Sequence, residues 1–457
     1  MTTAIQITDP ITESPPGPPS ISPRVASTTD VIGLTFTNAS SHPGMVSVRS
    51  TRMSEPAAGN PLRDSPPFRR LLLARTVSHI GDGIAVLALV LFVQDNRGTG
   101  TAVGALLLAT SIPRFLGPLA GAVVDRVEQR SVMVACDLGQ AVIFLAIAWL
   151  VPPFPALLAM VAAAATLDTL FAPAGRSALP ALVRPEQLLR ANAWIGTSLN
   201  IQVAVGPVLG GLLVTWLGVR GALAANALSF VVSALFLVGL PPLRASAGPA
   251  EEEAGFLAVG VEGIRYAWRT PILRTLMISL FVGVAFAGLD NVALVFLVRE
   301  TLSGGPLAFG LVTGAYGVGM LAGSLGLSWK GTAAAAGTVL VLGWVASGVG
   351  TVLTGVAPLL ALAALAQAVA GVGNAVEVVA TDTLVQGTVP REMLGRVFGL
   401  VGTAPFAGHT LAFAAGGFLL DVTSPRAVFL IAGLGVLLVL IPIMLVLRRE
   451  APNAPTP

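Results

Sequence analysis

Long apolar stretches dominate the chain between residues 68 and 447, and short polar, glycine-rich or proline-rich turns separate them. Each stretch has about twenty residues, the length that an α-helix rising about 1.5 Å per residue needs to cross ~30 Å of hydrocarbon. The pattern predicts spans near residues 70–92, 102–123, 131–151, 155–175, 197–217, 221–240, 275–297, 307–328, 336–355, 359–380, 397–418 and 425–446. The chain is therefore predicted to be an all-α polytopic membrane protein with twelve transmembrane helices.

The composition supports this prediction. Hydrophobic residues make up 54% of the chain and charged residues only 11%, whereas soluble domains carry about 25% charged residues. The net charge is +3, but the arginines lie in the turns between spans, so nucleic acid is not an expected partner. The single cysteine, Cys136, excludes a disulfide within one chain. We expect no cofactor and no metal.

Positive residues are distributed unequally between the two sets of turns. The rich set is Arg69, Arg70, Arg126, Arg130, Arg184, Arg190, Arg244, Arg265, Arg269, Arg274, Lys330, Arg391, Arg396, Arg448 and Arg449, and the poor set is Arg97, Arg220, Arg299 and Arg426. Cytoplasmic turns carry the excess of lysine and arginine. We therefore expect a multi-pass protein of the cytoplasmic membrane with both termini inside.

Composition also divides the chain into segments. The first 66 residues are rich in Pro, Ser and Thr and lack a membrane-length apolar run, which predicts a disordered cytoplasmic tail; a translation start at Met53 is an alternative. The longest interior loop holds an acidic run and an amphipathic stretch, which predicts a linker on the inner membrane face. The predicted tail, first six-helix bundle, linker, second six-helix bundle and C-terminal tail are residues 1–66, 67–240, 241–271, 272–447 and 448–457.

Short motifs recur in the same order in both halves of the chain. Residues 117–121 (GPLAG) match residues 319–323 (GMLAG) at an offset of 202 residues. The other matches are residues 183–188 with 388–393, and 210–211 with 416–417, at offsets of 205 and 206 residues. Six spans repeated in the same orientation are the organisation of a two-bundle transporter.

A charged turn lies between the second and third spans, in the run GPLAGAVVDRVEQR at residues 117–130. Such a turn needs water, so it marks one membrane surface. Gly121, one helical turn before Asp125, leaves room for a neighbouring helix. Asp125 can face the positive N-terminus of another helix or an arginine and so close the inner gate. The alternative is that Arg126 and Arg130 only anchor the topology.

These residues resemble the major facilitator superfamily, and within it the bacterial drug-efflux branch that includes macrolide and enterobactin exporters. The superfamily's signature after the second span is G-x-x-x-D-R-x-G-R-[RK]. The matching residues are Gly121, Asp125, Arg126 and Arg130, and the departures are Glu128 and Gln129. The resemblance extends over residues 68–447. It implies that this turn meets the start of the eleventh span near Arg396 and stabilises the outward-open state.

A second motif lies in the fifth span. It resembles a motif associated with antiporters, although its upstream glycine is replaced by Gln202, and its residues are Gly206, Pro207, Gly210 and Gly211. The resemblance implies a secondary transporter that exchanges its substrate for another species.

Ionisable side chains occur inside several spans, where a charge costs at least ~2.5–3.5 kcal/mol and so invites a functional hypothesis. Arg75, His79 and Asp82 have helical spacing and share one face of the first span. In the superfamily, spans 1, 4, 7 and 10 line the cavity. In this chain they carry His79 and Asp82, Asp168, Asp290 and Asn291, and Asn374 and Glu377.

A carboxylate in a low-dielectric environment binds a proton more readily than in water, as proton-coupled antiport requires. Asp82 and Glu377 are the predicted proton carriers, and His79 is placed to tune Asp82. The alternative for these residues is a structural ion pair between spans, such as Arg114 with Asp137 or Asp168.

The predicted function is proton-coupled efflux of small amphipathic molecules, drug-like or macrolide-like, by alternating access in a monomer. The alternatives are a dedicated metabolite or siderophore exporter, an importer, and a transport-inactive membrane sensor. The sequence lacks H-E-x-x-H, G-x-S-x-G and the phosphate-binding G-x-x-x-x-G-K-[ST], so we do not expect an enzyme or direct use of ATP.

Overall fold

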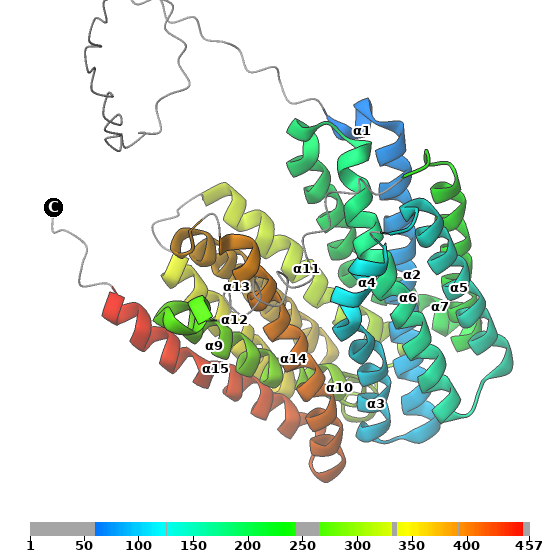
Figure 1. The fold of residues 1–457 in the computed structure, drawn as a ribbon. Helices are drawn as coiled ribbons and strands as arrows, with labels where there is room; N and C mark the ends of the chain where they lie inside the picture. The colour runs from blue at the N-terminus through cyan, green and yellow to red at the C-terminus, as the bar shows by residue number, and fades with distance from the viewer. Residues whose placement is uncertain (1–59, 125, 244–264, 331–335, 391–392, 451–457) are drawn as a thin grey trace, which may run out of the picture. The chain divides into compact units, whose positions relative to one another are not determined.

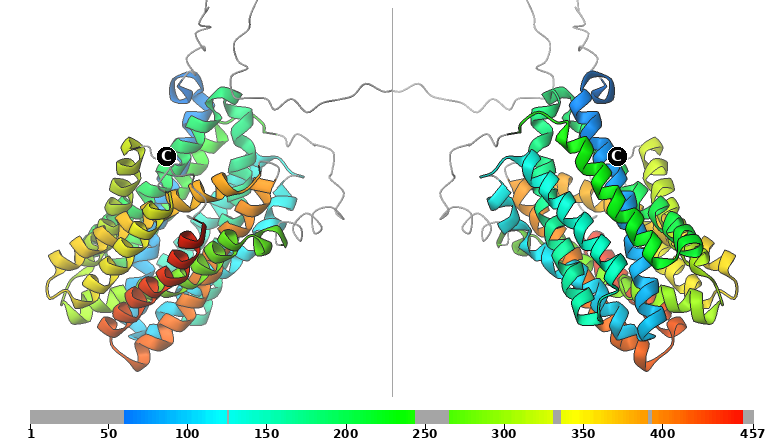
Figure 2. Two further views of the ribbon diagram at one scale, coloured as in Figure 1. Left: turned by 90° about the vertical axis from the view of Figure 1, so that its left-hand side faces the viewer. Right: turned by 90° about the vertical axis from the view of Figure 1, so that its right-hand side faces the viewer.

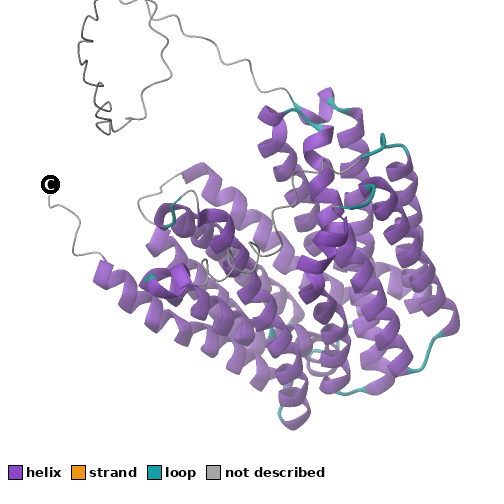
Figure 3. Ribbon diagram, in the orientation of Figure 1, coloured by secondary structure: helices purple, strands orange, loops and turns teal. Residues whose placement is uncertain are grey.

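The computed structural model describes residues 60–124, 126–243, 265–330, 336–390 and 393–450. Most of the predicted N-terminal tail and of the predicted linker, and the end of the C-terminal tail, lie outside these residues. Within them the secondary structure is helical, and no β-strand occurs (Figure 3).

The helices fall into a first half, before residue 244, and a second half, after residue 264 (Figure 1). The first half contains α1 (Pro61–Asp64), α2 (Pro66–Arg97), α3 (Gly100–Ser111), η1 (Ile112–Leu116), α4 (Gly117–Val124), α5 (Gln129–Leu150), α6 (Phe154–Leu182), η2 (Pro185–Gln187) and α7 (Leu188–Val238). The second half contains α9 (Pro271–Ala287), α10 (Leu289–Phe296), η3 (Leu297–Thr301), α11 (Pro306–Lys330), α12 (Ala336–Val356), α13 (Leu360–Thr388), α14 (Leu394–Val422) and α15 (Pro425–Glu450).

Each of the twelve predicted spans coincides with helical structure, although its continuity varies. Among the described residues, nine helices are long and apolar enough to cross a membrane. One of them, Pro185–Val238, contains two predicted spans, separated at Gly218, where a φ of 69° interrupts the helix. The second span is divided into α3, the 3-10 turn η1 and α4, and Pro113 in η1 lacks the N–H that a continuous α-helix would use.

The outer surface of this helical array is apolar. Large hydrophobic side chains are widely exposed, among them Trp149 at 81% and Trp216 at 71%. A monomeric soluble protein rarely exposes such an extensive apolar surface. The hydrocarbon of a bilayer is the solvent that suits these side chains.

The two halves contact each other mainly through two helix pairs, α7 with α11 and α3 with α14 (Figure 2), and α10 also contacts α2 and α3. Glycines make these contacts close. A Cβ on Gly310 of α11 would lie 2.3 Å from the carbonyl oxygen of Pro207 in α7. A Cβ on Gly104 of α3 would lie 2.4 Å from the carbonyl oxygen of Phe413 in α14.

Toward the opposite end of the two halves, the glycines of α4, α11 and α14 lack such close neighbours. A Cβ on Gly117 or Gly121 of α4, on Gly402 of α14 or on Gly326 of α11 would meet no described atom within 4 Å. We call the end that carries Gly117, Gly121, Gly326 and Gly402 the open end. The end that carries Gly104, Gly310 and Phe413 is the closed end.

The buried apolar side chains follow the same division. One cluster contains residues of both halves, and α2 contributes its later residues to it, from Ile84 to Val93. Two further clusters each lie in a single half, and the early part of α2, including Phe68 and Leu71, belongs to one of them. The core is therefore shared at the closed end and divided at the open end.

Candidate functional site

The charged turn lies at the open end, between α4 and α5. Asp125 itself lies outside the described residues. The close helix approach that we expected at Gly121 is not found, because no described atom lies within 4 Å of the position of a Cβ there. In this conformation Gly121 therefore does not pack against another helix of the described residues.

The two departures from the signature have local explanations. Glu128 has a φ of −68°, which any residue adopts, so this turn does not need the glycine of the signature. Its carboxylate accepts a hydrogen bond from Ser131 Oγ at 2.5 Å. Gln129 is 3% exposed, and its backbone N–H donates to the carbonyl oxygen of Leu243 at 3.0 Å. Arg126 is exposed and Arg130 is half-buried.

The motif of the fifth span lies between α2 and α11. A Cβ on Gly206 would lie 2.7 Å from Gly83 Cα in α2, and one on Gly210 would lie 3.1 Å from Ile84 Cα. On the other side, a Cβ on Gly211 would lie 2.6 Å from the carbonyl oxygen of Pro306. The motif thus joins a helix of its own half to a helix of the other half, where only small residues fit.

In the first half, the predicted carboxylates lie together. Asp82 of α2 is within electrostatic range of Asp168 of α6, and also of Arg75, Asp137 and Arg114. Asp82, Asp168 and Arg75 are half-buried, whereas Asp137 is 1% exposed. The Arg75 guanidinium also lies 4.7 Å from the ring centroid of Phe171, a cation–π distance. Arg75 therefore lies within electrostatic range of three carboxylates.

His79 has a different partner from the one we expected. It is 5% exposed, and its Nδ1 lies 3.0 Å from Ser198 Oγ of α7. It contacts α7 through this hydrogen bond rather than bonding to Asp82. The alternative of an ion pair between Arg114 and Asp137 or Asp168 is also not found, since neither carboxylate lies within 4 Å of Arg114 in the described structure.

In the second half, the break between α9 and α10 at Gly288 places Asp290 in the first turn of α10. Asn291 is exposed, and its Nδ2 donates to Asp290 Oδ1 at 3.0 Å. Glu377 of α13 is 5% exposed, and Asn374 lies one turn earlier on the same helix. A discontinuous helix that presents a polar group at membrane depth is a common element of transporter binding sites.

Sequence reasoning missed Tyr316 of α11. This half-buried tyrosine lies within electrostatic range of both Asp290 and Glu377, and we group the three residues as one cluster. It is one of only two tyrosines in the chain, and a lone tyrosine within an apolar span is the signal that could have revealed it.

The structure therefore groups the predicted cavity residues into two clusters, one in each half. The first contains Asp82, Asp168 and Arg75, and the second contains Asp290, Glu377 and Tyr316. Within the described ranges, no group of three or more His, Cys, Asp or Glu side chains is suited to hold a metal ion.

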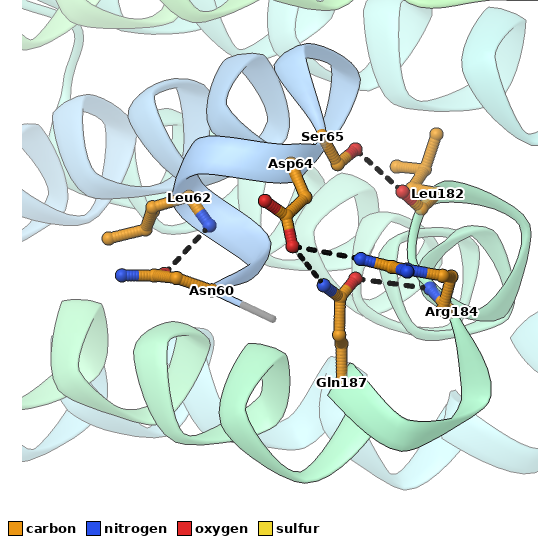
Figure 4. Close-up of polar contacts among 7 residues, drawn as sticks. All are labelled: Asn60, Leu62, Asp64, Ser65, Leu182, Arg184 and Gln187. Atoms are coloured by element: carbon orange, nitrogen blue, oxygen red, sulfur yellow. Dashed lines mark hydrogen bonds and ion pairs between the residues drawn. The ribbon is translucent and has the colours of Figure 1, made fainter. Parts of the chain in front are cut away.

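A polar network attaches α1 to the turn between α6 and α7 (Figure 4). Asp64 Oδ2 accepts hydrogen bonds from Arg184 Nη2 at 3.0 Å and Gln187 Nε2 at 2.7 Å. Ser65 Oγ donates to the carbonyl oxygen of Leu182 at 2.6 Å. The repeated motif at residues 183–188 therefore has a structural role in the first half, where it holds the start of the first span.

Removing the Asp64 carboxylate is expected to destabilise this attachment. Arg184 is 65% exposed, so water screens its ion pair, and most of the loss comes from Gln187, which is 1% exposed. We expect Asp64→Ala to cost about 1 kcal/mol and to lower the thermal unfolding midpoint in detergent. Glu186→Gln, at an exposed position in the same turn, is the control; equal midpoints for the two variants would contradict the prediction.

Comparison with known proteins identifies the family. The sequence profile of the Major Facilitator Superfamily matches residues 71–303 and 284–457. The chain belongs to the Major Facilitator Superfamily. It is a multi-pass membrane transporter and not an enzyme, as predicted.

Two individual proteins are similar to this chain over most of its length. The chain is 28% identical over 388 residues to the multidrug efflux pump Tap of Mycolicibacterium fortuitum, covering 81% of this chain and 93% of that protein. It is 27% identical over 395 residues to the enterobactin exporter EntS of Shigella boydii, covering 84% of this chain and 93% of that protein. The predicted resemblance to efflux proteins is confirmed.

Solved structures confirm the fold. The nucleoside transporter NupG superposes with a TM-score of 0.68 at 13% identity and covers 84% of this chain and 99% of its own. An inward-facing bacterial homologue of the iron transporter ferroportin superposes with a TM-score of 0.62 at 16% identity and covers 83% and 98%. The chain has the major facilitator fold.

Proposed function

We propose that this transporter exports small amphipathic molecules in exchange for protons, by alternating access. The observation that carries the proposal is the presence of one carboxylate cluster in each half, built from the first and fourth spans and from the seventh and tenth. Asp82 and Asp168 belong to the first cluster, and Asp290 and Glu377 to the second. We propose that the transporter functions as a monomer.

The arrangement of the two halves supports alternating access. The halves share a core at the closed end and lack close contacts between glycines and neighbouring helices at the open end. The arginine-rich turns, including Arg126 and Arg130, lie at the open end, which the positive-inside rule assigns to the cytoplasm. The conformation then corresponds to a state open to the cytoplasm, with both termini on that side.

The first cluster suggests how proton and substrate are coupled. Asp82 and Asp168 share the positive charge of Arg75, and two ionised carboxylates in range of each other repel. Protonation of Asp82 removes this repulsion, and the positive charge of Arg75 then interacts with the ionised Asp168 alone. A substrate that binds to the groups of the first cluster would then displace the proton from Asp82. In the second half, Glu377 would exchange its proton for substrate in the same way. His79 holds α2 against α7 through Ser198 while this exchange takes place.

The motif residues have complementary roles in this proposal. In the outward-open state, Gly121, Asp125, Arg126 and Arg130 would meet the start of α14 and close the cytoplasmic side. In the fifth-span motif, Pro207 and Gly211 would form the surface on which α7 moves against α11, whereas Gly206 and Gly210 would keep α7 close to α2.

Relatives named a multidrug efflux pump and an enterobactin exporter support export of drug-like molecules and, as a second candidate, export of a siderophore. Purified protein in liposomes with an imposed pH gradient separates these candidates. Broad transport of dyes and macrolides would support multidrug efflux, and transport of a siderophore alone would support the second candidate. If no compound moved under any gradient, the proposed function would be wrong.

A further inference from the structure

At the closed end, the carboxylate of Asp421 binds the N-terminus of α3. Its Oδ1 accepts a hydrogen bond from the backbone N–H of Gly100 at 2.5 Å, and its Oδ2 accepts one from Thr101 at 3.1 Å. The first N–H groups of a helix have no partner within the helix, and a negative charge beside them is stabilised by the helix dipole. Asp421 thus caps a helix that lies 321 residues away in the sequence.

This contact joins the two halves of the transporter. Asp421 follows the last apolar turn of α14 in the second half, whereas α3 belongs to the first. Only one side chain has to be ordered to make it, because both donors are backbone groups already held in a helix. A carboxylate that accepts two N–H groups forms a stronger contact than a neutral hydrogen-bond acceptor.

Glycines bring the two backbones close enough for the contact to form. A Cβ on Gly100 would lie 2.6 Å from the carbonyl oxygen of Gly417 and 2.7 Å from Leu420 Cβ. A Cβ on Gly417 would in turn lie 2.8 Å from the carbonyl oxygen of Gly100. The cap on α3 is therefore possible only while α3 and α14 are in contact at this end.

Two further contacts cross between the halves at the closed end. Arg299 Nη2 lies 2.7 Å from Asp95 Oδ1, and Gln94 Nε2 donates to Glu300 Oε1 at 3.1 Å. Both connect the end of α2 to η3. The Asp95 side chain is 46% exposed, so water screens its ion pair and limits its contribution.

The helix pair of α3–α4 with α14 is therefore asymmetric. It is joined at the closed end by Asp421, whereas a Cβ on Gly117, Gly121 or Gly402 at the open end would meet no described atom within 4 Å. Opening the closed end would separate α3 from α14 and expose two N–H groups and one carboxylate that now satisfy one another.

We propose that Asp421 is a latch that holds the closed end shut and is released when that side opens. This inference rests on the proposed alternating access.

The distance between two spin labels at the open end tests the latch. In a Cys136→Ser background, Glu186→Cys and Gln386→Cys place labels at exposed positions of the two halves. The distance between the two labels is then measured by pulsed electron–electron double resonance on the full-length protein in lipid nanodiscs. Asp421→Asn is expected to raise the ratio of the short-distance to the long-distance population by about tenfold, the usual effect of weakening a hydrogen bond to a charged group.

Thr423→Ala is the matched control, because Thr423 Oγ1 donates only within its own helix, to Leu419. It is expected to keep the wild-type ratio. If the wild type shows two populations and Asp421→Asn leaves their ratio at the control value, the latch is overturned while alternating access stands. If the wild type shows one population under every substrate and pH gradient, and no transport, the proposed function fails and the latch with it.

Discussion

Replacing Gly206 by valine is expected to abolish transport and to destabilise the protein strongly. A Cβ at this position would lie 2.7 Å from Gly83 Cα and 3.3 Å from the carbonyl oxygen of Ile80. These are backbone atoms of α2, so no side-chain rotation can relieve the overlap. Overpacking a closely packed site costs about 3 kcal/mol in unfavourable cases, and here either α7 must separate from α2 or the helices must bend.

Gly196→Val is the matched control for this experiment. Gly196 lies on the same helix, and a Cβ there would meet no described atom within 4 Å. Both variants change helix propensity alike, so the difference between them measures packing alone. Thermal unfolding in detergent and transport in liposomes are the two measurements. Similar unfolding midpoints would show that the contact between Gly206 and Gly83 does not limit stability.

Replacing Asp82 by asparagine is expected to remove proton-driven efflux while leaving substrate exchange intact. Asparagine keeps the size of the side chain but cannot take up a proton. Loss of a positioned proton-transfer group commonly costs about a hundredfold or more in rate, and we expect a loss of that order under a pH gradient. Exchange of labelled for unlabelled substrate without a gradient needs no net proton movement and should continue.

The control for this prediction is again Glu186→Gln, which removes a carboxylate at an exposed position of the turn after α6. It should show wild-type rates in both assays. Gradient-driven efflux at the wild-type rate by Asp82→Asn would rule out Asp82 as a proton carrier. Loss of exchange as well as efflux would instead indicate that Asp82 binds the substrate.

The positions of the spans and the family could be predicted from the sequence alone. A helix in a bilayer satisfies its backbone hydrogen bonds within its own segment, so local composition is sufficient to locate it. The Asp125–Arg126 turn and the repeated motifs identified the superfamily for a similar reason, because the spacing of neighbouring residues carries the signal.

Only the tertiary structure decided which of these residues meet. It brought Asp82 to Asp168, turned His79 to Ser198, added Tyr316 to the second cluster and placed Asp421 on the N-terminus of α3. It also decided that Gly206 is packed and Gly121 is not. These outcomes depend on how each helix is rotated and on which end of the two halves is closed. Both are set by packing between segments that lie far apart in the chain, which no local pattern encodes.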